Sequence, residues 1–353
     1  MTFAGWELGP LDFFRDRWAD SRFKDQAIAF LRKFVGTDSE SIENPAILCR
    51  EGQQLDGEMP SPEEVGALQL ALIFAFVDRN PRSRPENQDR GWAIGTADNA
   101  DLHVWPIDLE QGRVVKRTGY LVATHTVAFG ANDRELVLSP PVDLHMPFRA
   151  PSPDSLILTG IYETVLGSLR SPGANHEADA LRVAVDWFAR AWRNTATVEY
   201  PERLVYLKIA FEALTGTSRN WQSARWLRET FEALPGTTAS DSEILVWSPE
   251  EEPVHPRCWK DKCGHVQRTC ITDLEHWFMA FGTARNTIIH EGTVPDLTYT
   301  GQNPAYGGPF FFTAEFLFRA VIKVQLSKLG YHDAWHPESW RALRDALREQ
   351  IDR

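Results

Sequence analysis

The second half of the chain takes its fold from residues 272–292, which read TDLEHWFMAFGTARNTIIHEG. Thr272 and Glu275 form a capping-box pattern, in which each side chain satisfies the backbone N–H of the other residue at the start of a helix. Gly292 is a residue type that commonly ends a helix. Between them, apolar aromatic residues recur at roughly helical spacing: Trp277, Phe278 and Phe281. We therefore predict a helix that begins after Thr272 and runs to His290.

Helical patterns also surround this segment. The segment 204–214 is apolar almost all round, which predicts a buried central helix. The residues 235–270 are rich in proline, serine and acidic side chains, and they predict a long insertion between helices. The other helices that we predict follow Asn175 and cover about 221–234, 311–329 and 338–351. The second half, 172–353, is therefore predicted to be an all-α helical bundle.

The first half mixes helical and strand patterns. Residues 1–35 have apolar side chains at roughly helical spacing, and Ser61 with Glu64 forms another capping box before an apolar helix. From 91 to 148, short β-branched or aromatic runs alternate with turn residues and predict a small antiparallel sheet. The fold class that we predict is α+β: a mixed helix and antiparallel-sheet domain over 1–150, a proline-marked linker over 151–171, and the bundle.

Composition limits the classes of function. The chain has 353 residues, four cysteines and a formal net charge of −12. The negative charge argues against a protein that coats nucleic acid, because binding to phosphates needs clustered Lys and Arg. Neither a Gly-rich phosphate loop nor a Gly-x-Ser-x-Gly elbow occurs, so kinase and serine-hydrolase classes lack support. Residues 1–36 hold no signal-peptide pattern and no apolar run is long enough to span a membrane, so we expect a cytoplasmic protein without a membrane partner.

Arg285 and His290 are the candidate reactive pair of the sequence. Arg170 and His176 have a similar spacing, so spacing alone is weak evidence, and the helices around 285–290 distinguish the two pairs. One interpretation makes His290 a helix cap and Arg285 a surface ion-pair partner. The other makes them catalytic.

The second interpretation rests on a resemblance that covers about half of the chain. The segments Asp186–Ala191, Arg203–Leu214 and Ala284–Gly292 resemble the core helices and the motif of the HEPN family, in particular its Apea-like branch. The resemblance implies a homodimer in which two copies of the motif helix face each other and cut RNA without a metal, using the ribose 2′-OH as nucleophile. It assigns the catalytic residues Arg285, Asn286 and His290. Glu212 falls where that branch often has a glutamate.

The chemistry of the residues is compatible with this role. Histidine transfers protons near neutral pH, and arginine grips phosphate and stabilises its developing charge. The helix macrodipole favours a protonated His290 at a helix C-terminus. Five residues of an α-helix turn through about 140°, so Arg285 and His290 would not share a face. That geometry favours a composite site built by two protomers.

We therefore expect a homodimeric endoribonuclease that acts as a toxin or antiviral defence effector and needs no cofactor for catalysis. Residues 1–150 would be a regulatory or sensing domain, and an antitoxin or a trigger ligand would be a further partner beside the RNA substrate. The alternative is a non-catalytic HEPN module that dimerises and binds a partner as an adaptor.

A second cluster of candidate ligands precedes the motif helix. Its members are His255, Cys258, Cys263 and His265. These residue types bind zinc tetrahedrally, although the cysteine spacing is long for a zinc site. The segment is either a structural zinc site, which would make the protein a zinc-stapled adaptor, or a plain surface loop.

Overall fold

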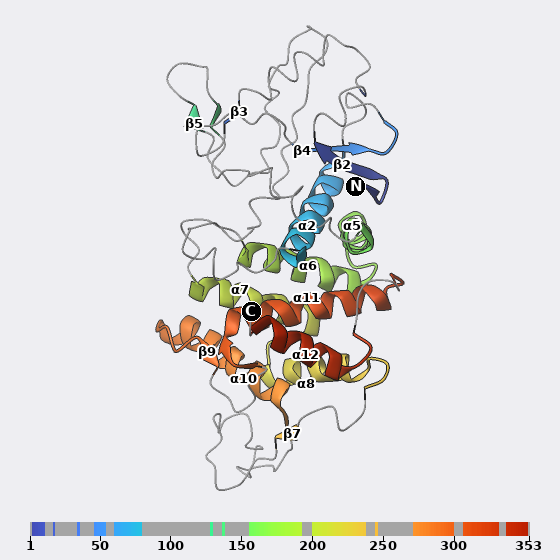
Figure 1. The fold of residues 1–353 in the computed structure, drawn as a ribbon. Helices are drawn as coiled ribbons and strands as arrows, with labels where there is room; N and C mark the ends of the chain where they lie inside the picture. Colours follow the sequence, from blue (N-terminus) through green and yellow to red (C-terminus); the bar gives the residue numbers. More distant parts are fainter. Residues whose placement is uncertain are drawn as a thin grey trace. The chain divides into compact units, whose positions relative to one another are not determined.

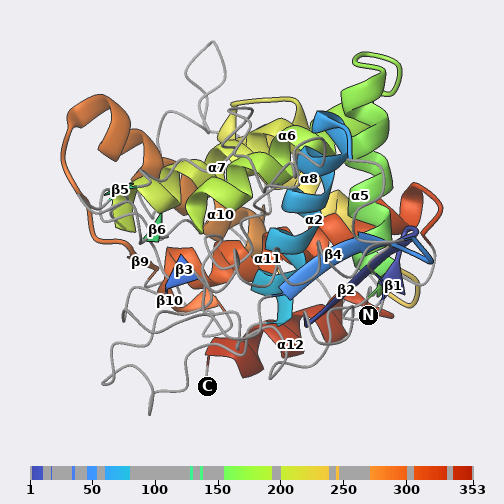
Figure 2. The ribbon, with the colours of Figure 1, turned by 90° about the horizontal axis from the view of Figure 1, so that it is seen from above.

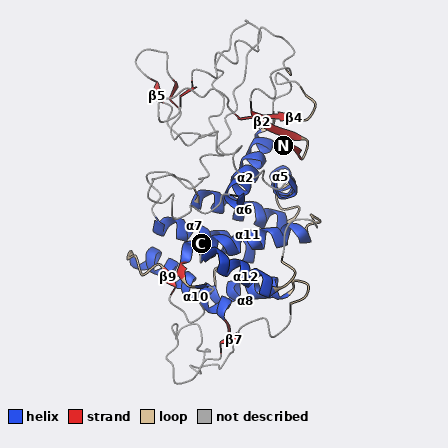
Figure 3. Cartoon of the chain, in the orientation of Figure 1, coloured by secondary structure: helices blue, strands red, loops and turns tan. Residues whose placement is uncertain are grey.

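The computed structural model divides the chain into two compact units. One unit comprises Met1–Asp179 with Trp192–Asn194, and the other comprises Ala180–Ala191 with Thr195–Arg353. The chain is mostly helical, with a small antiparallel sheet near the N-terminus, which agrees with the predicted α+β class (Figures 1, 2 and 3). The residues that the structure describes are 2–10, 17, 34–35, 46–53, 60–79, 128–129, 136–137, 155–192, 200–237, 244–245, 271–299, 306–331 and 337–351.

The N-terminal sheet replaces part of a predicted helix. Its three strands pair antiparallel in the order β1-β2-β4, where β1 is Thr2–Phe3, β2 is Trp6–Pro10 and β4 is Ala46–Arg50. The helix predicted over 1–35 is wrong for residues 2–10, which form strands; Trp6 and Leu8 are buried on either side of the half-buried Glu7, in the period of a strand. Most of 11–33 lies outside the described residues.

A second small sheet has two of its strands in the segment for which the sequence predicts strands. The strands β5 (Ala128–Phe129) and β6 (Leu136–Val137) pair antiparallel, and β3 (Phe34–Val35) runs parallel to β6. The predicted antiparallel sheet is confirmed for this strand pair. The remaining predicted strands between 91 and 148 lie outside the described residues.

Helix α2 (Pro62–Arg79) begins at the capping box that the sequence predicts. The Ser61 N–H donates to Glu64 Oε2 at 2.8 Å, and the Glu64 N–H donates to Ser61 Oγ at 3.2 Å. Glu64 also accepts hydrogen bonds from Arg50 of β4 at 2.7 Å and from Arg170 at 3.3 Å. These ion pairs tie the sheet, α2 and the end of the next helix together.

That next helix, α5 (Ser155–Arg170), corrects the predicted linker over 151–171. It packs along α2 and buries one face of apolar side chains, including Ile157, Ile161 and Val165. The apolar spacing of 156–166 is that of an amphipathic helix. The prolines that marked the predicted linker precede this helix in the sequence.

The second unit is a bundle whose helices begin and end close to the predicted positions. The central helix is α7 (Tyr200–Thr215), which contacts α8 (Asn220–Glu232), α10 (Asp273–Asn286) and α11 (Phe310–Lys328). The bundle also includes most of α6 (His176–Ala191), whose start is capped by Asn175 as predicted, and α12 (Trp340–Ile351). Two short strand pairs accompany the helices: β7 (Ile244–Leu245) with β8 (Ile271–Thr272), and β9 (Thr298–Tyr299) with β10 (Gly308–Pro309).

Aromatic side chains form the centre of the bundle. Phe211 of α7 meets Phe278 of α10 edge to face at 5.2 Å and Phe318 of α11 at 5.4 Å between ring centroids. Phe318 in turn stacks on Phe188 of α6 at 4.8 Å. Such aromatic contacts add to the stabilisation that burial of the rings provides. None of the helices described by the structure has both the length and the apolar character that crossing a membrane requires.

Candidate active site

Helix α10 is fixed at its start, which determines where its other end lies. The Thr272 N–H donates to Glu275 Oε2 at 2.8 Å, and the Glu275 N–H donates to Thr272 Oγ1 at 3.2 Å, so the predicted capping box is confirmed. Trp277, Phe278 and Phe281 are fully buried. Because both the cap and the aromatic face are held, the last turn of α10, which carries Arg285, has a defined position in the bundle.

Beyond Asn286 the α-helix widens into a π-helical turn, η3 (Thr287–Glu291), which ends at Gly292 with φ of 65°. A glycine adopts this left-handed conformation without steric cost, which explains the helix end that the sequence predicts. A π-turn closes hydrogen bonds over five residues instead of four, so each residue advances less around the axis. The angle of about 140° that was predicted for a continuous α-helix therefore does not apply to Arg285 and His290.

The three predicted catalytic residues differ in exposure. The side chain of Arg285 is 18 % exposed, whereas Asn286 and His290 are exposed. Arg285 Nη1 donates to Asn286 Oδ1 at 3.1 Å. The structure thus brings two of the three into contact, with His290 free to reach solvent at the same helix end.

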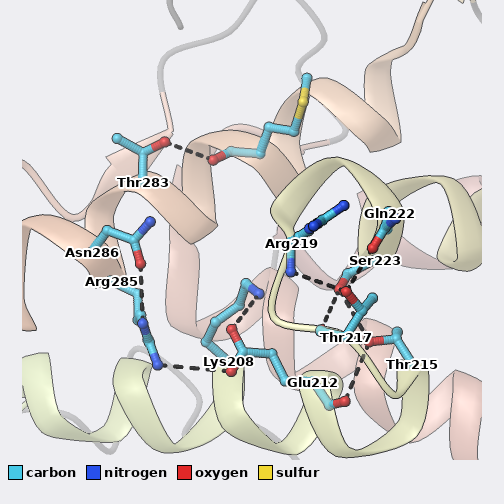
Figure 4. Close-up of polar contacts among 11 residues, drawn as sticks. Lys208, Glu212, Thr215, Thr217, Arg219, Gln222, Ser223, Thr283, Arg285 and Asn286 are labelled. Atoms are coloured by element: carbon cyan, nitrogen blue, oxygen red, sulfur yellow. Dashed lines mark hydrogen bonds and ion pairs between the residues drawn. The ribbon is translucent and has the colours of Figure 1, made fainter. Parts of the chain in front are cut away.

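Arg285 also belongs to an ion network with α7 (Figure 4). Its Nη2 lies 3.7 Å from Glu212 Oε2, and Lys208 Nζ donates to Glu212 Oε1 at 3.0 Å. Lys208 is fully buried, and its ammonium lies 5.0 Å from the centroid of the Phe278 ring. Burial lowers the pKa of Lys208, while the neighbouring Glu212 carboxylate acts in the opposite direction.

The network gives Glu212 a structural role and includes a residue that the sequence analysis missed. Lys208 stands out only as a lysine in an apolar helix, one turn before Glu212. That signal is available in the sequence, but its link to Arg285 requires the packing of α7 against α10. Arg285 is an ion-pair partner, as the first interpretation proposed. However, its partner Glu212 is half-buried and does not lie at the surface, as that interpretation assumed. His290 lies within the π-turn and is not the residue that caps the helix.

A hydroxyl network fixes the turn between α7 and α8 beside this site. Thr215 Oγ1 lies 3.0 Å from Ser223 Oγ, and Thr217 Oγ1 donates to Gln222 Oε1 at 2.7 Å (Figure 4). A Cβ at Gly282 of α10 would lie 2.3 Å from the side chain of Asn220. The glycine therefore lets the start of α8 approach α10 one turn before Arg285.

The similarly spaced pair Arg170 and His176 has a different setting. Arg170 ends α5 and pairs with Glu64, while His176 begins α6 across a turn. The two residues therefore lie on different helices, whereas Arg285 and His290 share one continuous helical segment. The two Arg–His pairs therefore differ in their structural setting, as predicted from the helices around them.

The candidate zinc ligands His255, Cys258, Cys263 and His265 lie outside the described residues, so the zinc interpretation stays a prediction. Within the ranges that the structure does describe, no group of three or more His, Cys, Asp or Glu side chains is arranged to hold a metal ion. Comparison of the chain with protein-family models, curated proteins and solved structures finds no match.

Proposed function

We propose that this chain is a metal-independent endoribonuclease whose active site combines Arg285, Asn286 and His290 from two copies. The observation that carries the proposal is the placement of the three residues at one helix end, where Asn286 and His290 are exposed and Arg285 is half-buried beside Glu212.

The chemistry needs two proton transfers. The ribose 2′-oxygen attacks the phosphorus, and the bond from phosphorus to the 5′-oxygen breaks, which leaves a 2′,3′-cyclic phosphate and a 5′-hydroxyl. One group accepts the proton of the 2′-OH and another donates a proton to the leaving oxygen. One histidine from each of two copies would supply base and acid. Arg285 would stabilise the charge on the phosphorane, and the NH₂ of Asn286 is available because its Oδ1 already accepts from Arg285.

The test is cleavage of a mixed RNA pool by the purified full chain in EDTA. We expect the wild type to leave 2′,3′-cyclic phosphate ends, and His290→Ala and Arg285→Ala to lose about 100-fold or more of the rate. His176→Ala is the matched control, because His176 is also exposed and has an arginine at similar spacing. Cleavage that persists in both motif variants would show that these residues are not the site.

A second candidate function, a non-catalytic dimerisation or binding module, has its own supporting observation. Two apolar side chains within four residues of His290 are exposed, Ile289 by 44 % and Val294 by 63 %. A partner surface that covers both side chains would remove them from water. Ile289→Ser with Val294→Ser should then reduce self-association in sedimentation velocity, whereas Trp221→Ser, at another exposed apolar side chain, should not. A folded dimer that cuts no RNA would favour this function.

The biological role that we propose for the nuclease is a toxin or antiviral defence effector, restrained by an antitoxin or released by a trigger acting on residues 1–150. Induced expression in a bacterial host tests this role. Growth should stop with the wild type and continue with His290→Ala at equal protein level. Equal growth in both cultures would remove the toxin role.

A further inference from the structure

Lys208 is a buried cation that the proposed chemistry does not use. Lysine is almost never fully buried unless it is paired, and moving an ammonium out of water costs several kcal/mol. The side chain of Lys208 is 0 % exposed in a helix that is otherwise mostly apolar. A methionine could fill similar space without that cost, so the charge of Lys208 needs a reason.

The two oxygens of Glu212 are divided between two cations. Lys208 holds Oε1 by a hydrogen bond of 3.0 Å, and Oε2 faces Arg285 Nη2 at 3.7 Å. The second distance is an ion pair but is longer than a hydrogen bond. Because the terminal torsion of glutamate is broad, the carboxylate has no intrinsic orientation, and the bond to Lys208 selects one.

The division of charge matters for Arg285. An arginine and a free carboxylate tend to form two parallel hydrogen bonds, which would engage the guanidinium fully. With Lys208 present, the shorter bond of the carboxylate goes to the ammonium. Arg285 therefore faces Glu212 without being hydrogen-bonded to it, and its Nη1 donates to the exposed Asn286.

We propose that Lys208 is a positioning residue for Arg285, which acts through Glu212 and keeps the guanidinium directed to a phosphate at the end of α10. The inference rests on the proposed ribonuclease function. Lys208 touches no substrate in this role. It keeps Glu212 from forming two hydrogen bonds with Arg285, which would direct the guanidinium toward α7 and away from the phosphate.

Steady-state cleavage of a short fluorogenic RNA by the full chain tests the proposal. Lys208→Met should lower kcat by about 10- to 100-fold, which is less than the loss expected for Arg285→Ala. Adding Glu212→Gln to Lys208→Met should restore kcat to within a few-fold of wild type, because a neutral amide no longer competes for the guanidinium. Arg190→Met, which breaks the exposed ion pair with Asp186 on α6, is the matched control and should keep its kcat.

Thermal melting of each variant, compared with the wild type, tests that the variant is folded. A loss of packing at residue 208 would not be relieved by a second substitution at 212, and equal unfolding free energies of Lys208→Met with and without Glu212→Gln would show that the recovery does not come from removing an uncompensated charge. A wild-type kcat in Lys208→Met would overturn the proposal, and so would a double variant no faster than Lys208→Met.

A second measurement does not depend on cleavage. The NMR signal of the Arg285 Nε–Hε group should shift in Lys208→Met, because the guanidinium gains the carboxylate as a hydrogen-bond partner, and should keep its wild-type position in Arg190→Met. If the folded wild type cuts no RNA, the nuclease proposal fails, and this signal alone decides the positioning role. An Arg285 signal that is unchanged in Lys208→Met overturns it.

Discussion

At the scale of single residues, Glu212 is the member of the ion network whose loss should cost most. Glu212→Leu leaves the ammonium of Lys208 buried without a counter-charge. Removing one partner of a buried ion pair typically destabilises a protein by about 3–5 kcal/mol. We expect a fall of that size in the free energy of unfolding, measured by urea denaturation.

The matched experiment replaces both charges. Lys208→Met with Glu212→Leu removes the ammonium and the carboxylate together, so the double variant should regain most of the lost stability. Arg225→Met with Glu229→Leu, at an exposed pair of the same spacing on α8, should leave stability nearly unchanged, because solvent screens the pair. If the double variant at 208 and 212 is as unstable as Glu212→Leu, an uncompensated charge is not the cause.

At the scale of elements, the two capping boxes allow a paired prediction. Thr272→Ala removes the acceptor of the Glu275 N–H at the start of α10, and Ser61→Ala removes the corresponding acceptor of the Glu64 N–H at the start of α2. Each should cost about 0.5–2 kcal/mol. Thr272→Ala should speed amide hydrogen exchange in the first turn of α10. Ser61→Ala, which removes the cap of a different helix, is the control and should leave that exchange unchanged. Equal exchange in both variants would mean that the cap does not hold α10.

Elements with strong local signals could be predicted from the sequence. Helix ends depend on contacts between neighbouring residues only, so they can be read from short patterns. The predicted helix ends at Ser61, Thr272 and Gly292 are confirmed. The π-turn could not be predicted, because no residue type marks it and α-helical spacing is the default. Helix α5 was hidden by the prolines before it, although its apolar spacing was present in the sequence.

At the scale of the whole molecule, contacts between charged side chains of different helices could not be predicted from the sequence. Arg285 was found through its motif, but its link to Lys208 spans two helices that are far apart in the chain. Sequence periodicity shows which face of a helix is apolar and not which partner a charged side chain meets. The packing of α5 against α2 likewise joins segments that are far apart in the chain.

The last prediction concerns the assembly of the proposed site. If base and acid come from the histidines of two copies, a dimer of wild type and His290→Ala has only one of them and should be inactive. Wild type refolded together with a ninefold excess of His290→Ala should keep about a tenth of its cleavage rate, because random pairing leaves about that share of wild-type chains with a wild-type partner. The same proteins refolded separately and assayed at once after mixing should keep the full rate. A full rate after joint refolding would place each site within a single copy of the chain.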